Sequence, residues 1–241
     1  MSEIKALLRD TCLPNLAGKY KYFSIHAVRD CLRSHGCSVQ PETLNSYLAE
    51  LVQAKNLFSA GRGWYSGIAD PYQLDRKPVQ EVVSAMEKQY PLLAFTCWST
   101  EQVKTHMHHL LNRFVTFVFT ESDAMSTLYE FLRDSGYDAW LNPRGKESRR
   151  FSVGEKTVVI RRNITEEPIQ GHYAAIEKIL VDLYVEAEDL NLMDRDEYQR
   201  MQQNAIESGR VEVATMIRYA KRRKLAPTDA FPWLGSITGT Y

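Results

Sequence analysis

The sequence predicts a mixed α+β protein of two domains, and three observations lead to this prediction. The 241 residues are 44% hydrophobic and 25% charged, a normal balance for a globular chain with a buried core. Apolar positions recur with helical and strand-like periods in alternation over residues 1–160, and with a helical period from Tyr173 onward. Residues 68–77 break the periodicity, so we expect a linker there.

The first helix is predicted over residues 3–11, because apolar side chains recur there at helical spacing, and it is expected to end before Pro14. Residues 19–23 alternate basic and aromatic side chains, as a short half-buried strand does. Ser24 is the predicted N-cap of a second helix, which ends at Gly36.

A third helix is predicted over residues 41–54, with Pro41 in its first turn and one apolar face. Residues 56–66 have the pattern of a strand, a glycine turn and a second strand. The order helix, strand, helix, helix, hairpin is typical of a winged helix-turn-helix domain, which we assign to residues 1–68. A generic small α+β bundle is the alternative.

Residues 78–225 are predicted to form an α/β domain with a helical C-terminal part. Helices are expected from Pro78, over 99–111 and from Ser122. The expected strands are residues 92–98, 113–120, 139–141 and 157–160. Residues 173–224 are expected to be all helix, and residues 226–241 a C-terminal tail lying over the surface.

The charge is divided unevenly although the chain as a whole has 30 basic and 30 acidic residues. Residues 1–65 have a net charge of +3, which leaves −3 for the remainder. This balance argues against indiscriminate coating of nucleic acid and favours the N-terminal domain as the place for phosphate contacts.

DNA-binding candidates follow from the winged-helix prediction. In such domains the second helix of the helix-turn-helix presents polar residues near its start to base edges, and basic residues around it contact phosphates. The candidates for base contacts are Thr43, Asn45 and Ser46. The candidates for backbone contacts are Lys19, Lys21, Lys55 and Arg62, the last of these at the hairpin tip. A solvated turn residue is the alternative reading of Arg62.

A candidate basic surface is predicted further along the chain. Arg149, Arg150, Arg161 and Arg162 flank one predicted strand. If they project together they form a surface for DNA, RNA or an acidic partner, and the alternative is that they are solvated strand ends.

Motifs for catalysis give no positive support for an enzyme. Walker, Gly-x-Gly-x-x-Gly and Gly-x-Ser-x-Gly sequences are absent. Asp194-Arg195-Asp196 is better explained as a helix N-cap, and the spacing of His106, His108 and His109 does not suit a metal site on one helix face. We therefore predict no catalytic residue and no cofactor.

The four cysteines, Cys12, Cys31, Cys37 and Cys97, contain no C-x-x-C pair. We interpret them as buried thiols rather than disulfides or zinc ligands, so no metal is predicted. No apolar run approaches the ~20 residues that cross a bilayer, and no hydrophobic signal core follows Met1, so a cytoplasmic location is expected.

Three segments resemble the AbiEi antitoxin family. They are Gly61-Arg62-Gly63-Trp64-Tyr65, residues 175–183 with Glu177-Lys178 and Asp182, and Tyr219-Ala220-Lys221-Arg222-Arg223. The likeness spans about residues 18–225. It implies a transcriptional autorepressor and antitoxin of a type IV toxin–antitoxin system in phage defence, with operator DNA and a nucleotidyltransferase toxin as partners.

An alternative function is a winged-helix module for protein–protein interaction, or a regulator without a toxin partner. The predicted recognition helix carries acidic Glu42 and Glu50 and no base before Lys55, which is unusual for a strong DNA binder. An apolar outward face on residues 41–54 would favour protein binding, and the sequence does not show one. The sequence does not specify an oligomeric state.

Overall fold

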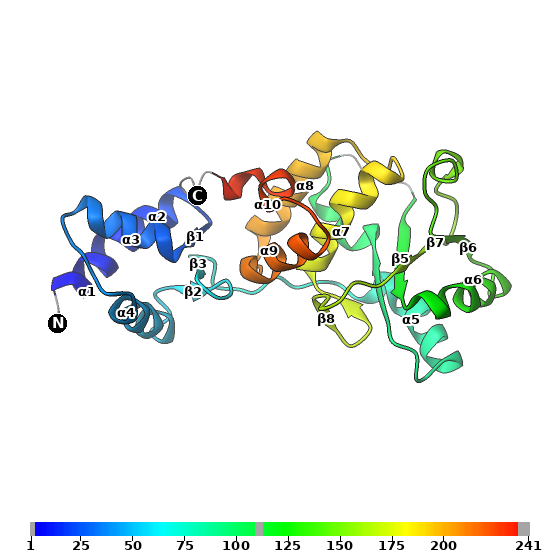
Figure 1. Cartoon of the computed structure of the whole chain (residues 1–241), viewed down its shortest axis with the longest axis horizontal. Coiled ribbons are helices and arrows are strands. Elements are labelled where there is room, and N and C mark those ends of the chain that lie inside the picture. Colours follow the sequence, from blue (N-terminus) through cyan, green and yellow to red (C-terminus); the bar gives the residue numbers. More distant parts are fainter. Residues whose placement is uncertain (1–2, 109–112, 236–241) are drawn as a thin grey trace. The chain divides into compact units, whose positions relative to one another are not determined.

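The computed structural model describes residues 3–108 and 113–235, and the chain divides into two compact units (Figure 1). The terminal unit contains residues 1–72 and 206–241, and the central unit contains residues 73–205. The mixed α+β composition is confirmed. Among the described residues, no helix has the length and apolar character needed to cross a membrane.

The first helix of the terminal unit continues through Pro14, contrary to the sequence prediction. α1 (Glu3–Leu7), a π-helical turn (Leu8–Cys12) and α2 (Leu13–Lys19) follow one another directly. Proline has no N–H to donate to the carbonyl four residues earlier, and the chain forms a wider π-helical turn just before it. In this turn the N–H of Leu13 donates to the carbonyl of Leu8, five residues earlier. The helix therefore ends at Lys19.

The rest of the N-terminal segment has the predicted order. β1 (Tyr22–Ser24) leads into α3 (Ile25–Ser34), and α4 (Pro41–Gln53) leads into the hairpin of β2 (Phe58–Ser59) and β3 (Trp64–Ser66). Ser24 caps α3, because its hydroxyl accepts from the N–H of Ala27 at 3.3 Å. The three strands form one antiparallel sheet in the order β1-β3-β2, so β1 and β2 are its edges.

The C-terminal segment belongs to the same unit, which corrects the predicted boundaries 78–225 and 226–241. α8 (Arg195–Ser208) crosses the boundary of the units, and α9 (Val213–Arg222), α10 (Pro227–Ala230) and a 3₁₀ turn (Pro232–Leu234) follow it. Up to Leu234 the C-terminal tail does not lie over the surface as predicted, because Ala230, Phe231 and Leu234 are buried. Residues 236–241 lie outside the described part.

Tyr22 of β1 fixes this C-terminal segment. Its hydroxyl lies 2.8 Å from the carbonyl oxygen of Ile206 and 3.1 Å from that of Gly209, and accepts from the N–H of Val211 at 3.0 Å. Its ring packs on Trp233 at a centroid distance of 5.8 Å. Buried polar groups need such partners, so residues 206–233 complete the N-terminal fold.

The central unit is built on a six-stranded mixed sheet with the order β6-β7-β5-β4-β9-β8. The strands are β4 (Phe95–Ser99), β5 (Val115–Thr120), β6 (Asp138–Leu141), β7 (Thr157–Arg162), β8 (Ile169–Gln170) and β9 (Tyr173–Ala174). β4 and β5 are antiparallel, whereas β5 and β7, β6 and β7, and β4 and β9 are parallel pairs. The predicted helix from Tyr173 starts too early, since Tyr173 pairs with Cys97 across the sheet.

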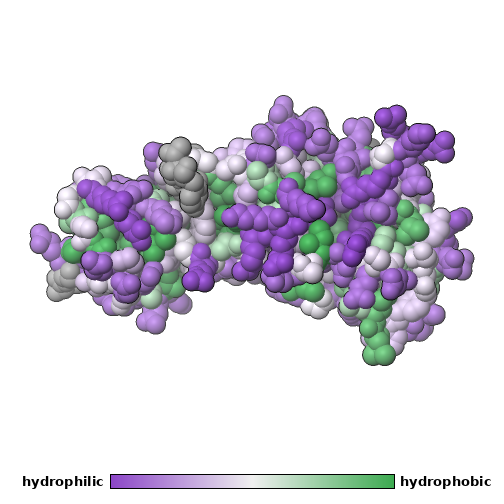
Figure 2. Space-filling model, in the orientation of Figure 1, coloured by the Kyte–Doolittle hydropathy of each residue, from purple (hydrophilic) through white to green (hydrophobic). Residues whose placement is uncertain are grey.

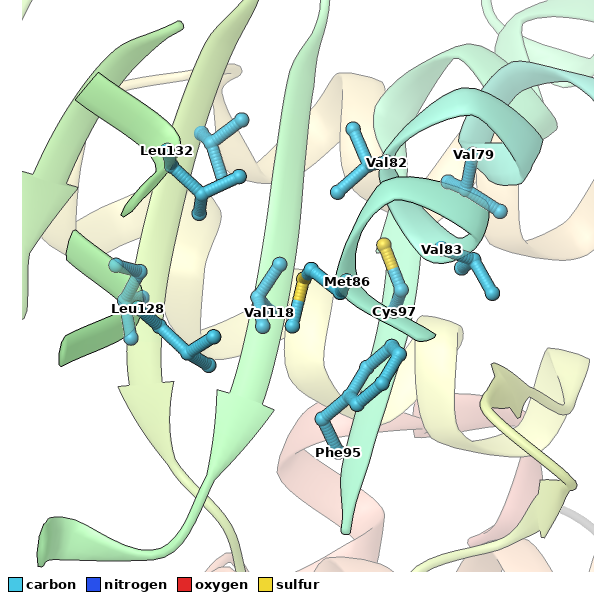
Figure 3. Packing of buried hydrophobic residues seen from close by; sticks show 11 residues of the cluster. Val79, Val82, Val83, Met86, Phe95, Cys97, Val118, Leu128 and Leu132 are labelled. Carbon is cyan, nitrogen blue, oxygen red and sulfur yellow. The ribbon is translucent and has the colours of Figure 1, made fainter. Parts of the chain in front are cut away.

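Helices cover both faces of this sheet. α5 (Lys77–Gln89) and α6 (Met125–Asp134) pack on one face, where Val79, Phe95, Val118, Leu128 and other buried side chains form a core (Figure 3). α7 (Ile176–Asp189) faces Phe119 of β5 on the other side of the sheet. The predicted helix 99–111 is a 3₁₀ helix over Thr100–His106 in the described residues, and His109 lies outside them.

Candidate nucleic-acid interface

α4 turns a polar face outward from the terminal unit. Leu44, Leu48 and Leu51 are buried, and Thr43, Asn45 and Ser46 are exposed. At 3.6 residues per turn, Ser46 lies opposite the leucine stripe, while Thr43 and Asn45 flank that stripe about 160° apart. Glu42, Ala49 and Gln53 are also exposed on this outward face.

Glu50 of α4 forms an ion pair with Lys5 of α1. The same ammonium group lies 5.9 Å from the centre of the Tyr47 ring. The acidic charge that argued against DNA binding is therefore balanced from within the unit. Glu42 lies in the first turn of α4, where a carboxylate is favoured by the helix dipole.

The hairpin tip presents Arg62 as an exposed side chain. Gly61 and Gly63 have φ angles of +93° and +74°, and the N–H of Trp64 donates to the carbonyl of Gly61 at 2.9 Å to close the turn. These positive angles suit glycine, because other residues pay a steric cost there. Arg62 therefore lies at the tip of a hydrogen-bonded glycine turn.

The predicted lysines are exposed but do not form one cluster. Lys21 directly precedes β1 and Lys55 precedes β2, and these strands are the opposite edges of the sheet. Lys19 ends α2, with its ammonium 5.1 Å from the centre of the Tyr20 ring. The lysines therefore lie at separate places around the terminal unit.

α9 adds basic residues to the terminal unit, whereas the sequence prediction placed them in the domain of residues 78–225. Its exposed bases are Arg218, Lys221 and Arg222, with Lys224 just after it, and the surface over α9 is strongly hydrophilic (Figure 2). The terminal unit consequently contains 14 Lys and Arg against nine Asp and Glu, a net charge of +5, and the central unit has −5. The apolar residues around Phe231 were the sequence signal that the C-terminal segment belongs to a domain core, because such side chains need to be buried.

The predicted basic surface at Arg149, Arg150, Arg161 and Arg162 is wrong at Arg161. This side chain is 2% exposed and donates to Glu186 at 2.6 and 3.0 Å and to the carbonyl of Pro143 at 2.9 Å. It lies on β7, a strand with neighbours on both sides, and is covered by α7. Arg149, Arg150 and Arg162 are exposed.

A second buried ionic group joins α7 to the chain after β7. The ammonium of Lys178 lies 2.7 Å from Asp182 and 3.2 Å from Glu167, and 3.6 Å from the centre of the Phe119 ring. Glu167 also accepts from the hydroxyl of Thr96 at 3.1 Å. Each buried charge in this group therefore has a partner, and we interpret the group as structural rather than catalytic.

The Asp194-Arg195-Asp196 segment and the segment with His106 and His108 both make structural hydrogen bonds. Asp194 caps α8, because its carboxylate accepts from the N–H of Glu197 at 2.7 Å, which confirms the N-cap interpretation. The carboxylate of Glu197 accepts from the N–H of His108 at 2.7 Å, and burial lowers the pKa of His106.

Comparison with known proteins gives one family and one solved structure. Residues 43–228 match the family described as "Family of unknown function (DUF6577)". A comparison with curated proteins finds no match. The chain is 12% identical to the RV2827C protein from Mycobacterium tuberculosis, over 89% of this chain and 81% of that one, with a TM-score of 0.26. A TM-score this low carries no structural argument.

The family match starts in α4 and ends in α10, so it includes all of the central unit and parts of the terminal unit on both sides of it. It therefore extends over the recognition-helix candidate, the hairpin and the basic end of α9. The chain belongs to the DUF6577 family, a family of unknown function.

Proposed function

We propose that the terminal unit is a winged helix-turn-helix that binds DNA, with α4 in the major groove and the β2–β3 hairpin as the wing. The order α2, β1, α3, α4, β2, β3 and the sheet order β1-β3-β2 support this assignment. Only residues 35–40 separate α3 from α4, as in a helix-turn-helix.

The observation that carries the proposal is the division of charge. The unit that holds α4 has a net charge of +5 in a chain whose total is zero. Such a field attracts phosphate and accelerates encounter with DNA. A protein-binding winged helix would need an apolar outward face, and Ala49 is the one apolar side chain among the exposed residues of α4 after Pro41.

The residues near the start of α4 are the ones that contact base edges in this proposal. Asn45 and Thr43 lie at the two edges of its outward face, and an asparagine amide can make a bidentate contact with adenine. Arg62 at the wing, with Lys19, Lys21 and Lys55, supplies sequence-independent contacts to phosphate.

The test is equilibrium binding of the full chain to labelled duplexes from upstream of its own coding region, with a scrambled duplex as reference. Asn45→Ala should reduce discrimination at one base pair by roughly 1–3 kcal/mol, whereas Arg62→Ala should weaken binding to both duplexes alike. Lys88→Ala, an exposed lysine of the central unit, is the matched control. Equal affinity for both duplexes in the unaltered chain would contradict operator recognition.

We further propose, on the resemblance to the AbiEi family, that this binding represses the chain's own promoter and that the chain is the antitoxin of a nucleotidyltransferase toxin. The test is co-expression of the full chain with the product of the adjacent gene. Restored growth supports the antitoxin role, and continued toxicity in the presence of folded chain contradicts it. Repression without protection would favour the regulator that has no toxin partner.

A further inference from the structure

Three potential metal ligands meet at one end of α3 in the terminal unit. Cys12 closes the π-helical turn, Cys31 lies in the last turns of α3, and His35 directly follows that helix. One ligand atom from each lies within 4.8 Å of the others. Zn–S bonds are about 2.3 Å long, which places the sulfurs of a tetrahedral site roughly 3.8 Å apart, so a small movement closes the set around an ion.

The His35 ring has a hydrogen-bond partner of the kind that metal-bound histidines usually have. Its Nδ1 lies 2.9 Å from the carbonyl oxygen of Cys31 and 3.3 Å from the hydroxyl of Ser34. A histidine whose Nδ1–H donates to a backbone carbonyl has a fixed ring and a lone pair on Nε2. The helix provides this support, because Cys31 and His35 are four residues apart and lie on the same side of it.

Cys37 stands outside this group of three and is the next sulfur donor along the chain after His35. Cys37 is half-buried, and it lies in the turn between α3 and α4. Because it lies two residues after His35, a change in this short turn would bring its sulfur to the ion as a fourth ligand.

We propose that Cys12, Cys31 and His35, with Cys37 as the fourth ligand, bind one zinc ion. Thiolate and imidazole donors in a tetrahedral arrangement select zinc over the oxygen-preferring cations. Cys12 is buried and His35 is exposed, so the site has a closed side and a side through which the ion enters.

The ion would link three segments of the backbone. These are the π-helical turn, the end of α3 and the Gly36 turn that leads into α4. This proposal departs from the interpretation of Cys12, Cys31 and Cys37 as inert thiols, whereas Cys97 is a buried thiol in β4. The spacing of the ligands, C-x₁₈-C-x₃-H-x-C, hides the site from a search for C-x-x-C pairs.

The test is the metal content of the full chain purified under reducing conditions, together with cobalt substitution. We expect about one zinc per chain, and cobalt absorption bands typical of tetrahedral thiolate ligation. A chelator should lower the melting temperature. Cys97→Ser, which changes a buried cysteine of the central unit, should keep all three properties.

His35→Ala keeps the test decisive if Cys12→Ser or Cys31→Ser fails to fold, because His35 is exposed. It should weaken zinc binding at least about tenfold, and His26→Ala, an exposed histidine on the same helix, should not. Cys37→Ser should weaken zinc binding as well, and unchanged binding by this variant would overturn the assignment of Cys37 as the fourth ligand. The proposal is overturned if the unaltered chain holds no zinc after incubation with it, if His35→Ala binds equally well, or if Cys12 and Cys31 form a disulfide under those conditions.

Discussion

The backbone N–H of Ala214 donates to the carbonyl oxygen of Ala60 at 3.3 Å, so the first turn of α9 lies against the hairpin that bears Arg62. A Cβ atom placed on Gly61 would lie 2.7 Å from the Cβ of Ala214 and 3.0 Å from the carboxylate of Glu212. The proposed wing is thus supported by a helix from the other end of the chain.

Gly61→Ala should destabilise the terminal unit more than Gly36→Ala does. Both glycines have positive φ angles, which costs a substituted residue about 1 kcal/mol, but only Gly61 has a close neighbour within 4 Å. The overlap with Ala214 adds roughly 1–3 kcal/mol. Denaturant unfolding of the two variants measures the difference, and equal losses would show that α9 does not pack on the hairpin.

Tyr22→Phe should lower the free energy of unfolding by about 1–3 kcal/mol, because it leaves buried backbone groups of residues 206–211 without their partner. Tyr20→Phe, which changes a half-buried tyrosine two residues earlier, is the control. On the same grounds a fragment of residues 1–68 should not fold independently. A stable, cooperatively unfolding fragment would contradict the assignment of the C-terminal segment to this unit.

Arg161→Ala should cost about 3–5 kcal/mol, because Glu186 is fully buried and would lose its charged partner. Arg162→Ala changes the neighbouring exposed residue and should alter stability by less than about 0.5 kcal/mol. Thermal and chemical unfolding of this pair measures the contrast. A mild effect of Arg161→Ala would mean that the buried ion pair is dispensable.

Glu212→Gln should make the chain more stable at neutral pH. Burial raises the pKa of Glu212 above its ordinary value, and Arg210 offsets part of that rise. The folded state therefore holds this proton more tightly than the unfolded chain, and stability falls as the pH rises from the unfolded pKa through the folded pKa. The difference between the variant and the unaltered chain should vanish at acidic pH, and a variant that is less stable at pH 7 would contradict the prediction.

The sequence predicted local features well where one residue decides them. The capping roles of Ser24 and Asp194, the proline at the start of α4 and the glycine turn around Arg62 all follow from short-range backbone chemistry. Pro14 shows the limit of this reasoning, because a π-helical turn allowed the helix to continue where a regular helix could not.

Long-range relationships were beyond a single sequence. Nothing in the spacing of Tyr22 and Val211 indicates that the two ends of the chain share one core, and Arg161 is indistinguishable from Arg162 until β7 is known to be covered by α7. The convergence of Cys12, Cys31 and His35 likewise depends on tertiary packing. The seven proposed DNA-contacting residues are all exposed on the terminal unit, as the predicted role requires.

The salt dependence of DNA binding by the full chain shows whether the terminal unit contacts phosphates. If the terminal unit contacts a handful of phosphates, affinity for the upstream duplex should fall on the order of a hundredfold between 50 and 200 mM salt, taking about 0.9 released ions per contact. Arg62→Ala should reduce the slope of log affinity against log salt by about 1, and Lys88→Ala should leave it unchanged. An affinity that does not change with salt, or a slope that Arg62→Ala does not alter, would rule out the proposed phosphate contacts of the terminal unit.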